Sequence, residues 1–390
     1  MNILFIYSAA IHPFSGGVER VTFLLANYLE SKGYKVFFLG LTDDNSIKDK
    51  RQFLLPDPSS FLSQKNITFF RSFLIEKSIK IVINKGGTDP ETSSFAYNCK
   101  IEGVKLISNV HNSLLGTVKN FSSVHKIKFD KTGIGWLLPL TQTKIVKNLL
   151  LKLYKKKYAK HYKSLCEKSD YVILESDKFK EELMFFMDGQ SIDNVNGISN
   201  FVLLEETTRI EKKKEILFVG RINTSQKRVD LLLEIWSLLY DKFPDWSLNV
   251  VGGGEELESI KRLSGQLGLQ NIFFYGFQNA KPYYESASVI CLTSSYEGFG
   301  VTLIEAMHYG AVPIAFDSYL SVTDIIDDAV NGCLITPFNT KEYANALSKL
   351  MSSKKELESY SAKAVQKAKN FDLSIIGQQW LELIKKTNIN

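Results

Sequence analysis

Short apolar runs alternate with amphipathic stretches from the first residues of the chain. Residues 3–7 form a short run of β-forming apolar residues, residues 17–31 place their apolar side chains at helical spacing, and residues 35–39 again indicate a strand. Runs of the same kind follow at 79–83, 104–108 and 171–174. Because a buried parallel strand is a short continuous apolar run, this alternation predicts a parallel sheet covered by helices.

The same pattern starts again after residues 205–215, a polar and charged stretch that is typical of a linker between domains. The pattern predicts helices at 227–241 and 255–266, and strands at 216–219, 247–251, 272–275, 289–292 and 312–316. A chain of 390 residues is also too long for one ordinary core. We therefore expect an α/β protein with two Rossmann-like domains, residues 1–200 and residues 201–372.

The chain begins with a strand-like stretch and ends with an amphipathic one. Residues 373–390 could cover either domain, and we assign them to the first. The first residues lack the basic segment of a signal peptide, and no run reaches the roughly 20 apolar residues of a membrane-spanning helix. The cysteines, which show no CxxC spacing, are Cys99, Cys166, Cys291 and Cys333. We expect a cytoplasmic protein without a disulfide framework or zinc site.

Positive charge is concentrated in the first half of the chain. Residues 1–200 hold 28 Lys and Arg against 19 Asp and Glu, whereas the remainder holds 20 against 23. Within this half, residues 119–168 contain 13 lysines, only two acids, and exposed-type apolar residues that include Trp136. This mixture suits an anionic membrane surface, although a solvated basic helix explains it nearly as well. Nucleic acid is a weaker alternative because no stacking platform or recognition motif accompanies the lysines.

Basic residues and glycines follow the predicted strands of the second half. Gly220 and Arg221 come directly after one strand, and Lys227 and Arg228 stand at the start of the next predicted helix. Further glycines at strand ends are Gly252, Gly253, Gly254 and Gly276. In open α/β sheets, ligands bind outside the carboxyl ends of the strands, and cations with bare amides there suit a diphosphate. Each feature alone is also compatible with a solvated loop or a plain turn.

The most specific pattern is Glu297-Gly298-Phe299-Gly300 followed by Glu305. The two glycines leave bare amides at the start of a helix, where an anion or a hydroxyl-rich sugar can bind. Glu305 lies about one and a half turns into this helix, among apolar residues, where a charge usually has a partner. Carboxylates at these two positions can accept hydrogen bonds from pairs of sugar hydroxyls.

These motifs together resemble the GT-B glycosyltransferases of family 4, the group 1 family. The resemblance covers residues 216–340 and includes Gly-Arg-(x)5-Lys, the Gly-Gly-Gly-Glu turn, and an E-x7-E signature at Glu297 and Glu305. It implies the GT-B fold, in which two Rossmann-like domains face a central cleft. The spacing from Arg221 to Lys227 is one residue longer than in the commonest family form, so Arg228 could share or replace the role of Lys227.

The resemblance also implies a role for each site residue. Glu305 would hold the donor ribose, and Glu297 with the backbone of Phe299 and Gly300 would bind the transferred sugar. Arg221 and Lys227 would neutralise the leaving diphosphate. The remaining glycines expected to line the substrate site are Gly253, Gly276 and Gly298.

The first half contributes a glycine pair and one histidine. Gly16 and Gly17 follow the first strand and open the first helix, where they free the loop to approach a ligand. His111 ends a strand-like stretch and is followed by Asn112. A lone histidine is more often structural, but the resemblance implies contact with the transferred sugar, through orientation or electrostatics. Asn196-Gly197-Ile198 matches the family weakly, and Gly197 is a plausible hinge.

The reaction expected from the resemblance is sugar transfer with retention of the anomeric configuration. The donor would be a nucleotide sugar, with UDP expected from family frequency. The basic segment 119–168 suggests that the acceptor is a lipid-linked saccharide of a bacterial surface polymer. No Asp-x-Asp occurs in the sequence, so we expect neither a metal nor another cofactor. Two alternatives remain open, a nucleotide-sugar 2-epimerase on the same fold and a non-catalytic partner subunit.

Overall fold

The computed structural model describes residues 1–13, 16–42, 49–205 and 211–389, and it divides into two compact units. The first unit consists of Met1–Leu114, Lys155–Leu203 and Asp372–Asn390. The second consists of Leu115–Tyr154 and Leu204–Phe371. The sequence pattern placed all of residues 1–200 in the first domain, whereas in the structure residues 115–154 belong to the second unit. Residues 206–210 of the expected linker lie outside the described residues.

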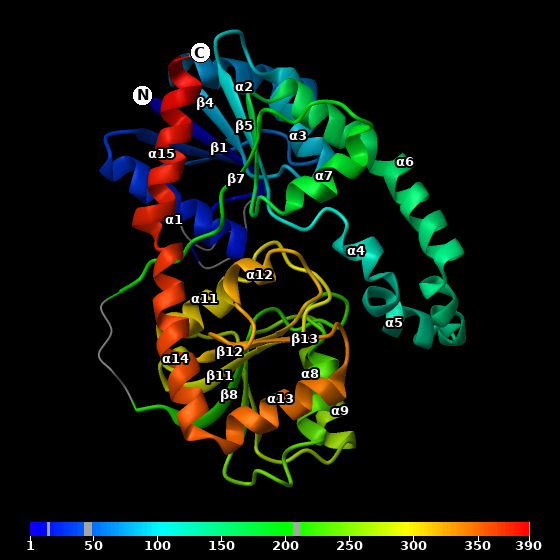
Figure 1. Ribbon diagram of the computed structural model, residues 1–390. Helices are drawn as coiled ribbons and strands as arrows, with labels where there is room; N and C mark the ends of the chain where they lie inside the picture. The colour runs from blue at the N-terminus through cyan, green and yellow to red at the C-terminus, as the bar shows by residue number, and fades with distance from the viewer. Residues whose placement is uncertain (14–15, 43–48, 206–210, 390) are drawn as a thin grey trace. The chain divides into compact units, whose positions relative to one another are not determined.

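The first unit is built on a parallel seven-stranded sheet in the order β3-β2-β1-β4-β5-β6-β7 (Figure 1). Its strands are β1 (Asn2–Ala9), β2 (Lys35–Thr42), β3 (Gln52–Leu54), β4 (Ile79–Asn84), β5 (Lys105–Val110), β6 (Tyr171–Leu174) and β7 (Val195–Gly197). Its helices are α1 (Gly17–Ser31), α2 (Gln64–Glu76), α3 (Pro90–Cys99), α7 (Phe179–Met187), α15 (Leu373–Ile389) and the later part of α6 (Lys144–Lys168). Of these strands, the apolar runs predicted β1, β2, β4, β5 and β6, whereas β3 and β7 span only three residues each.

Alternate residues of each strand point to opposite faces of this sheet, and both faces are buried under helices. Phe5 and Phe38 face a core that also contains Trp380 and Ile384 of α15. On the opposite face, neighbouring strand residues pack against α2 and α3. Helix α15 lies against α1, where a Cβ atom at Gly377 would stand 2.6 Å from the Tyr28 ring. The C-terminal helix therefore completes the core of the first unit.

The second unit contains a six-stranded parallel sheet in the order β10-β9-β8-β11-β12-β13. Its strands are β8 (Lys213–Val219), β9 (Ser247–Val251), β10 (Ile272–Gly276), β11 (Ala287–Leu292), β12 (Val312–Phe316) and β13 (Cys333–Ile335). Its helices after the first strand are α8 (Val229–Ser237), α9 (Leu257–Gln266), α10 (Lys281–Ser286), α11 (Val301–His308), α12 (Val322–Ile325), α13 (Thr340–Ser352) and α14 (Lys354–Ala368), followed by the 3-10 turn η2 (Lys369–Phe371). Helices α8 and α13 cover one face through Trp236 and Tyr343, while α11 and α14 pack on β11 and β12.

Several boundaries in this unit differ from the sequence prediction, among them the starts of β8 and α8. Strand β8 begins at Lys213, inside the expected linker, because Lys213 pairs with Ala287 of β11 and Glu215 with Ser247 of β9. Helix α8 begins at Val229 rather than 227, since Arg228 adopts a left-handed backbone conformation with φ of 50°. The turn before α8 is therefore longer than expected, which bears on the position of Lys227.

Residues 115–154 form a helical segment with α4 (Gly116–Lys119), α5 (Phe121–Lys131), the 3-10 helix η1 (Gly135–Gln142) and the start of α6. Hydrogen bonds fix this segment to the second unit. The Asn120 amide donates to the carbonyls of Ser295 (2.6 Å) and Ser318 (2.9 Å), and the hydroxyls of Ser123 and Ser295 lie 2.8 Å apart. These long-range bonds are the physical reason for its grouping. None of the described helices has the length and apolar composition that crossing a bilayer requires.

Candidate functional site

The carboxyl ends of neighbouring strands in the second unit place several predicted site residues along one edge of the sheet. Strands β10, β9, β8 and β11 are adjacent and parallel. Gly276 ends β10, Gly253 follows β9, Arg221 follows β8, and Glu297 lies in the loop after β11. The four positions therefore share the edge at which open α/β sheets bind ligands.

The glycines at these strand ends allow adjacent loops to pack closely. The Gly220 amide donates to the Val251 carbonyl (3.0 Å), and the Gly252 amide donates to the Gly276 carbonyl (2.8 Å). Gly252 has φ of 141°, and a Cβ atom there would collide with the Gly220 carbonyl oxygen. Gly253 has more room, because a Cβ atom at this position would meet only Phe277, at 3.6 Å. Packing therefore explains Gly252, whereas Gly253 leaves backbone accessible at the edge.

Glu297 and Lys227 form a mostly buried ion pair. The Lys227 ammonium nitrogen lies 2.6 Å from Oε1 of Glu297, and the two side chains are 14% and 9% exposed. The Ser294 hydroxyl donates to the same oxygen over 2.6 Å. The backbone of Lys227 is fixed as well, because its amide donates to Asn223 Oδ1 and its carbonyl accepts from Thr293. The sequence motifs after β8 and after β11 thus meet in direct contact.

The two arginines have different surroundings. Arg221 is exposed and has no hydrogen bond or ion pair to any described residue. Arg228, in contrast, is 2% exposed, is paired with Asp230 at 2.8 Å, and donates to the Ser123 hydroxyl. Its guanidinium therefore links α8 to the helical segment. In this position Arg228 is not placed to share or take over the expected diphosphate-binding role of Lys227. Lys227 is the cation that lies beside Glu297.

The start of α11 is shaped by the Gly298-Phe299-Gly300 turn. Gly300 precedes the helix with φ of 97°, a conformation that favours glycine. Phe299 is 2% exposed and packs against the Phe371 ring, so the residue offers its backbone rather than its side chain. The Gly298 carbonyl accepts from the Ser321 hydroxyl at 2.7 Å. These contacts fix the turn that precedes α11.

Glu305 is partly buried in the second turn of α11. Its Oε2 accepts a hydrogen bond of 2.8 Å from the hydroxyl of Tyr284 on α10. The carboxylate on this half-buried helix therefore has the partner that the sequence led us to expect.

Tyr319 is a residue of this region that the sequence did not single out. It is 5% exposed, and its hydroxyl is buried without a hydrogen-bond partner among the described residues. Burial, with the nearby charges of Glu297 and Asp317, raises the pKa of Tyr319 well above its usual value of 10. A Cβ atom at Gly300 would stand 2.9 Å from this hydroxyl. Tyr319 thus offers an unused donor beside the start of α11.

In the first unit, His111 lies just after β5 within a buried group of polar side chains. Its Nδ1 is 2.5 Å from Oε1 of Glu175, which follows β6, and both side chains are at most 5% exposed. The Asn200 amide donates to the same carboxylate oxygen over 2.7 Å. Nε2 of His111 is buried and has no hydrogen-bond partner among the described residues. Burial, and then the charge of Lys85, hold the pKa of His111 well below 6.5, so the ring is neutral near pH 7.

Lys85 follows β4 and is the cation of this group. It is 2% exposed, and its Nζ lies 2.5 Å from Asn109 Oδ1 and 5.4 Å from the Trp380 ring centroid. Burial lowers the pKa of Lys85 to about 7, against the attraction of Glu175. Lys85, His111 and Glu175 therefore occupy the carboxyl ends of three successive strands in the sheet.

The three glycines predicted in the first unit differ in their surroundings. Gly16 and Gly17 open α1, and Gly17 has open space where a Cβ would be. The Gly197 amide donates to Asp177 Oδ1 over 3.0 Å, and a side chain at Gly197 would collide with the Asp177 backbone. Close packing explains Gly197 without a hinge.

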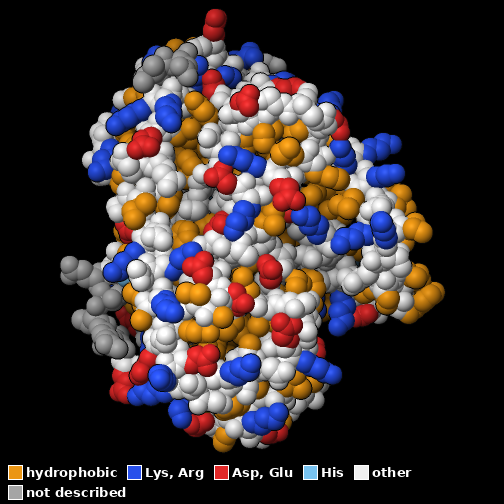
Figure 2. All heavy atoms as spheres, in the orientation of Figure 1, with side chains coloured by type: hydrophobic (Ala, Val, Ile, Leu, Met, Phe, Trp, Pro, Cys, Tyr) orange, Lys and Arg blue, Asp and Glu red, His pale blue; other side chains and the backbone are white. Residues whose placement is uncertain are grey.

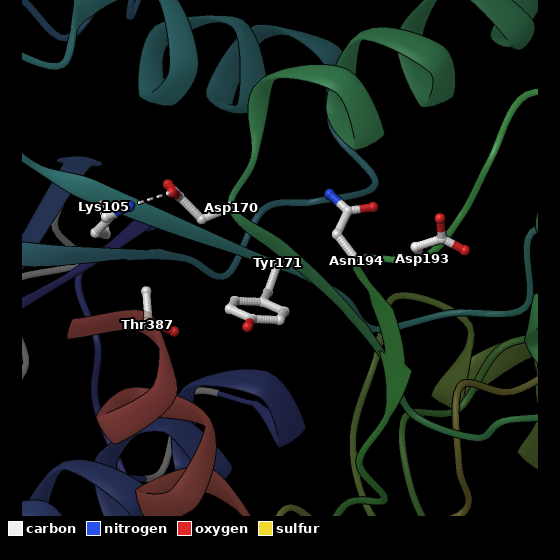
Figure 3. A pocket seen from close by; sticks show the side chains of 6 residues that line it. All are labelled: Lys105, Asp170, Tyr171, Asp193, Asn194 and Thr387. Carbon is white, nitrogen blue, oxygen red and sulfur yellow. Dashed lines mark ion pairs between the residues drawn. The ribbon is translucent and has the colours of Figure 1, made fainter. Parts of the chain in front are cut away.

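A separate hollow lies at the opposite, amino-terminal edge of the same sheet (Figure 3). It is lined by Lys105, Asp170, Tyr171, Asp193, Asn194 and Thr387. Lys105 pairs with Asp170 at 3.2 Å, and the Asn194 amide donates to two carbonyls. Because these groups already have partners, the hollow is not part of the candidate site. In the described part of the chain, no group of three or more His, Cys, Asp or Glu residues is arranged to hold a metal.

The fold and the second unit define the class of protein. A solved structure of Anabaena Alr3699/HepE in complex with UDP and glucose has the same fold, with a TM-score of 0.74 at 16% identity, covering 99% of this chain and all of the other. Residues 203–369 match the family model for glycosyl transferases group 1. The chain is accordingly a glycosyltransferase with the GT-B fold, two α/β units each built on a parallel sheet.

Two relatives show how far the similarity extends along the chain. An uncharacterised glycosyltransferase of Haemophilus influenzae is 26% identical over 94% of this chain and 95% of its own length. A lipopolysaccharide 1,6-galactosyltransferase of Salmonella typhimurium is 30% identical over 47% of this chain. The aligned region spans about half of the galactosyltransferase (53%). The alignment with this galactosyltransferase is thus restricted to part of the molecule.

Proposed function

We propose that this chain transfers a hexose or N-acetylhexosamine from a UDP-sugar to a saccharide acceptor, with retention of the anomeric configuration. The Lys227–Glu297 pair at the strand edge carries the proposal, because it combines a cation for a diphosphate with a carboxylate for sugar hydroxyls. Arg221 at the neighbouring strand end adds a second cation, one without an ion pair to any described residue. The similar proteins act on galactose or bind UDP and glucose, according to their names.

In this proposal each residue acts on a different part of the donor. Lys227 and Arg221 neutralise the leaving diphosphate, together with the first amides of α11. Glu297 accepts hydrogen bonds from the sugar, and Glu305 from the ribose. His111 contributes from the first unit as a neutral acceptor at Nε2. No residue is assigned as a covalent nucleophile.

The test is a panel of nucleotide sugars with UDP, GDP and ADP as the nucleotide. Thermal shift identifies the donor, and UDP release is then measured with and without saccharide acceptors, including lipid-linked ones. We expect UDP-sugars to stabilise the protein and release of UDP to depend on acceptor. The anomeric proton coupling of the product tests retention. Epimerisation of the donor without acceptor would instead identify an isomerase, and binding without turnover a non-catalytic subunit.

We also propose that the helical segment 115–154 docks on an anionic membrane, which would place the enzyme beside a lipid-linked acceptor. Its exposed apolar side chains, with their exposed fractions, are Trp136 (73%), Leu140 (52%), Ile145 (83%), Leu149 (54%) and Leu153 (56%). Residues 115–154 also carry seven lysines and one acid. Figure 2 shows apolar and basic side chains together on this part of the surface. Apolar insertion combined with positive charge is the chemistry that binds anionic lipid surfaces.

Vesicle sedimentation tests this docking. We expect binding to phosphatidylcholine vesicles that contain phosphatidylglycerol, and little binding to phosphatidylcholine alone. Ile145→Glu should weaken binding, because residues 145, 149 and 153 form one stripe along α6. The control is Ile75→Glu, since Ile75 is also exposed (66%) but lies at the end of α2. Equal loss in both variants, or self-association through this face without lipid binding, would contradict the proposal.

A further inference from the structure

A buried carboxylate, Glu175, stands behind His111. Its Oε1 lies 2.5 Å from His111 Nδ1, and the residue is 2% exposed. An ionised carboxylate can only accept hydrogen bonds, so the imidazole carries its hydrogen on Nδ1. The Asn200 amide donates to the same oxygen at 2.7 Å, which holds the carboxylate in place behind the ring.

This pairing determines what the other ring nitrogen can do. In a neutral imidazole with hydrogen on Nδ1, Nε2 is an acceptor. Nε2 of His111 is buried and has no partner among the described residues. Leaving a buried polar atom without a partner is costly, so such an atom in a native protein points to a bound ligand or water. The partner that fits an imidazole acceptor is a hydroxyl donor.

We propose that Glu175 is a positioning residue, which fixes the ring and tautomer of His111 so that Nε2 accepts a hydrogen bond from a hydroxyl of the transferred sugar. The inference rests on the proposed sugar transfer and adds a residue to it. Glu175 itself does not touch the substrate. Its effect therefore depends on His111, and this dependence separates positioning from a general structural role.

A double-mutant cycle measures the dependence. The variants are His111→Ala, Glu175→Gln and the two combined, with UDP release from UDP-glucose and UDP-galactose as the readout. Each single change should lower kcat roughly 2- to 15-fold, the factor for one hydrogen bond, and leave UDP affinity unchanged. In the His111→Ala background, Glu175→Gln should have no further effect. Independent, multiplying losses would overturn the proposal.

Glu182 supplies the matched control. It is also 2% exposed, and it accepts from the Ser113 hydroxyl at 2.8 Å rather than from the His111 ring. Glu182→Gln should leave the effect of His111→Ala unchanged. Where Glu175→Gln does not fold, Glu175→Asp keeps the charge but shortens the reach, and it should lower kcat in the same way.

The tautomer of His111 is observed directly by long-range ¹H–¹⁵N NMR, with His111→Ala for assignment. We expect the Nδ1–H form in the wild type and the appearance of the Nε2–H form in Glu175→Gln. An Nε2–H tautomer in the wild type would overturn the proposal. If the wild type released no UDP from any UDP-sugar, the proposed transfer would fail, and the NMR result alone would decide whether the pairing exists.

Discussion

Glu297→Gln separates the two roles that we assign to the Lys227–Glu297 pair. The change keeps the size of the side chain and removes its charge, so Lys227 loses its counterion at 2.6 Å. Breaking a fully buried pair costs about 3–5 kcal/mol. Because these side chains are 14% and 9% exposed and the lysine stem is flexible, we expect about 2 kcal/mol. For a unit of this size, that lowers Tm by roughly 4–8 °C.

The donor should reverse this loss. A diphosphate replaces the missing counterion of Lys227, so UDP should stabilise Glu297→Gln more than it stabilises the wild type. We expect UDP affinity, measured by calorimetry, to be equal or up to about 10-fold higher, because Lys227 no longer has to leave Glu297. Turnover should fall roughly 10- to 150-fold, the range for a lost hydrogen bond to a charged group.

A surface pair provides the control for this experiment. Glu258 pairs with Lys261 on α9 at 2.8 Å, and both side chains are well exposed. Glu258→Gln should therefore change stability by less than about 1 kcal/mol and leave turnover unaffected. A fall of 10-fold or more in UDP affinity in Glu297→Gln, or unchanged turnover, would refute the assignment.

Three further predictions concern packing, pH and metal. Gly252→Ala should destabilise the protein by about 2–4 kcal/mol in urea unfolding, because a Cβ atom at this position collides with backbone. Gly265→Ala on α9, where a Cβ atom has open space, should be neutral or stabilise the protein by up to about 1 kcal/mol. Equal effects of the two substitutions would contradict the packing argument. The pKa of Lys85 is about 7 in the folded protein against 10.5 in the unfolded chain, so the free energy of unfolding should fall by at most about 5 kcal/mol as pH decreases from 10.5 to 7. Between pH 7 and 9 the free energy of unfolding should depend more steeply on pH in the wild type than in Lys85→Met. Identical pH dependence in the two proteins would exclude Lys85 as its source. Incubation with EDTA should leave UDP release unchanged, and loss of activity that Mg²⁺ or Mn²⁺ restores would show a metal requirement.

The sheets were predictable because their central strands are buried on both faces. The run at residues 79–83 is apolar except for Lys80, and it is short for a helix, so pattern and length together identify β4. Strands β3 and β7 lack such a signal, since each pairs over three residues only. Their existence depends on partners supplied by the rest of the sheet.

Candidate site residues can be proposed from sequence where they follow such runs closely. Arg221 was proposed in this way, and Glu297 from the Glu-Gly-Phe-Gly motif. Glu175 carries the first kind of signal, because it comes immediately after the apolar run 171–174. Its partner His111 lies 64 residues earlier in the chain, so only the adjacency of β5 and β6 shows that the two side chains meet. The hydroxyl of Tyr319 has no local signal at all.

Arg228 shows the limit of motif spacing most clearly. In sequence it stands next to Lys227, and an extra residue in the turn made the two cations interchangeable candidates. In the structure its left-handed backbone turns the side chain away, toward Ser123, which is 105 residues distant. Spacing along the chain fixes the order of the cations, whereas the direction of each side chain depends on tertiary partners.

The same long-range contacts connect the proposed membrane surface with the donor site. Ser294 donates to Glu297, and the next residue, Ser295, shares a hydrogen bond with Ser123 of the helical segment and accepts one from Asn120. The loop that holds Glu297, the carboxylate proposed to bind the sugar, is thus bonded on one side to the segment that carries the exposed apolar stripe. Since both belong to one compact unit, attachment of that segment to a membrane would constrain the proposed donor-binding loop directly. Lipid binding and donor binding should therefore be energetically coupled, and by linkage each would strengthen or weaken the other by the same factor.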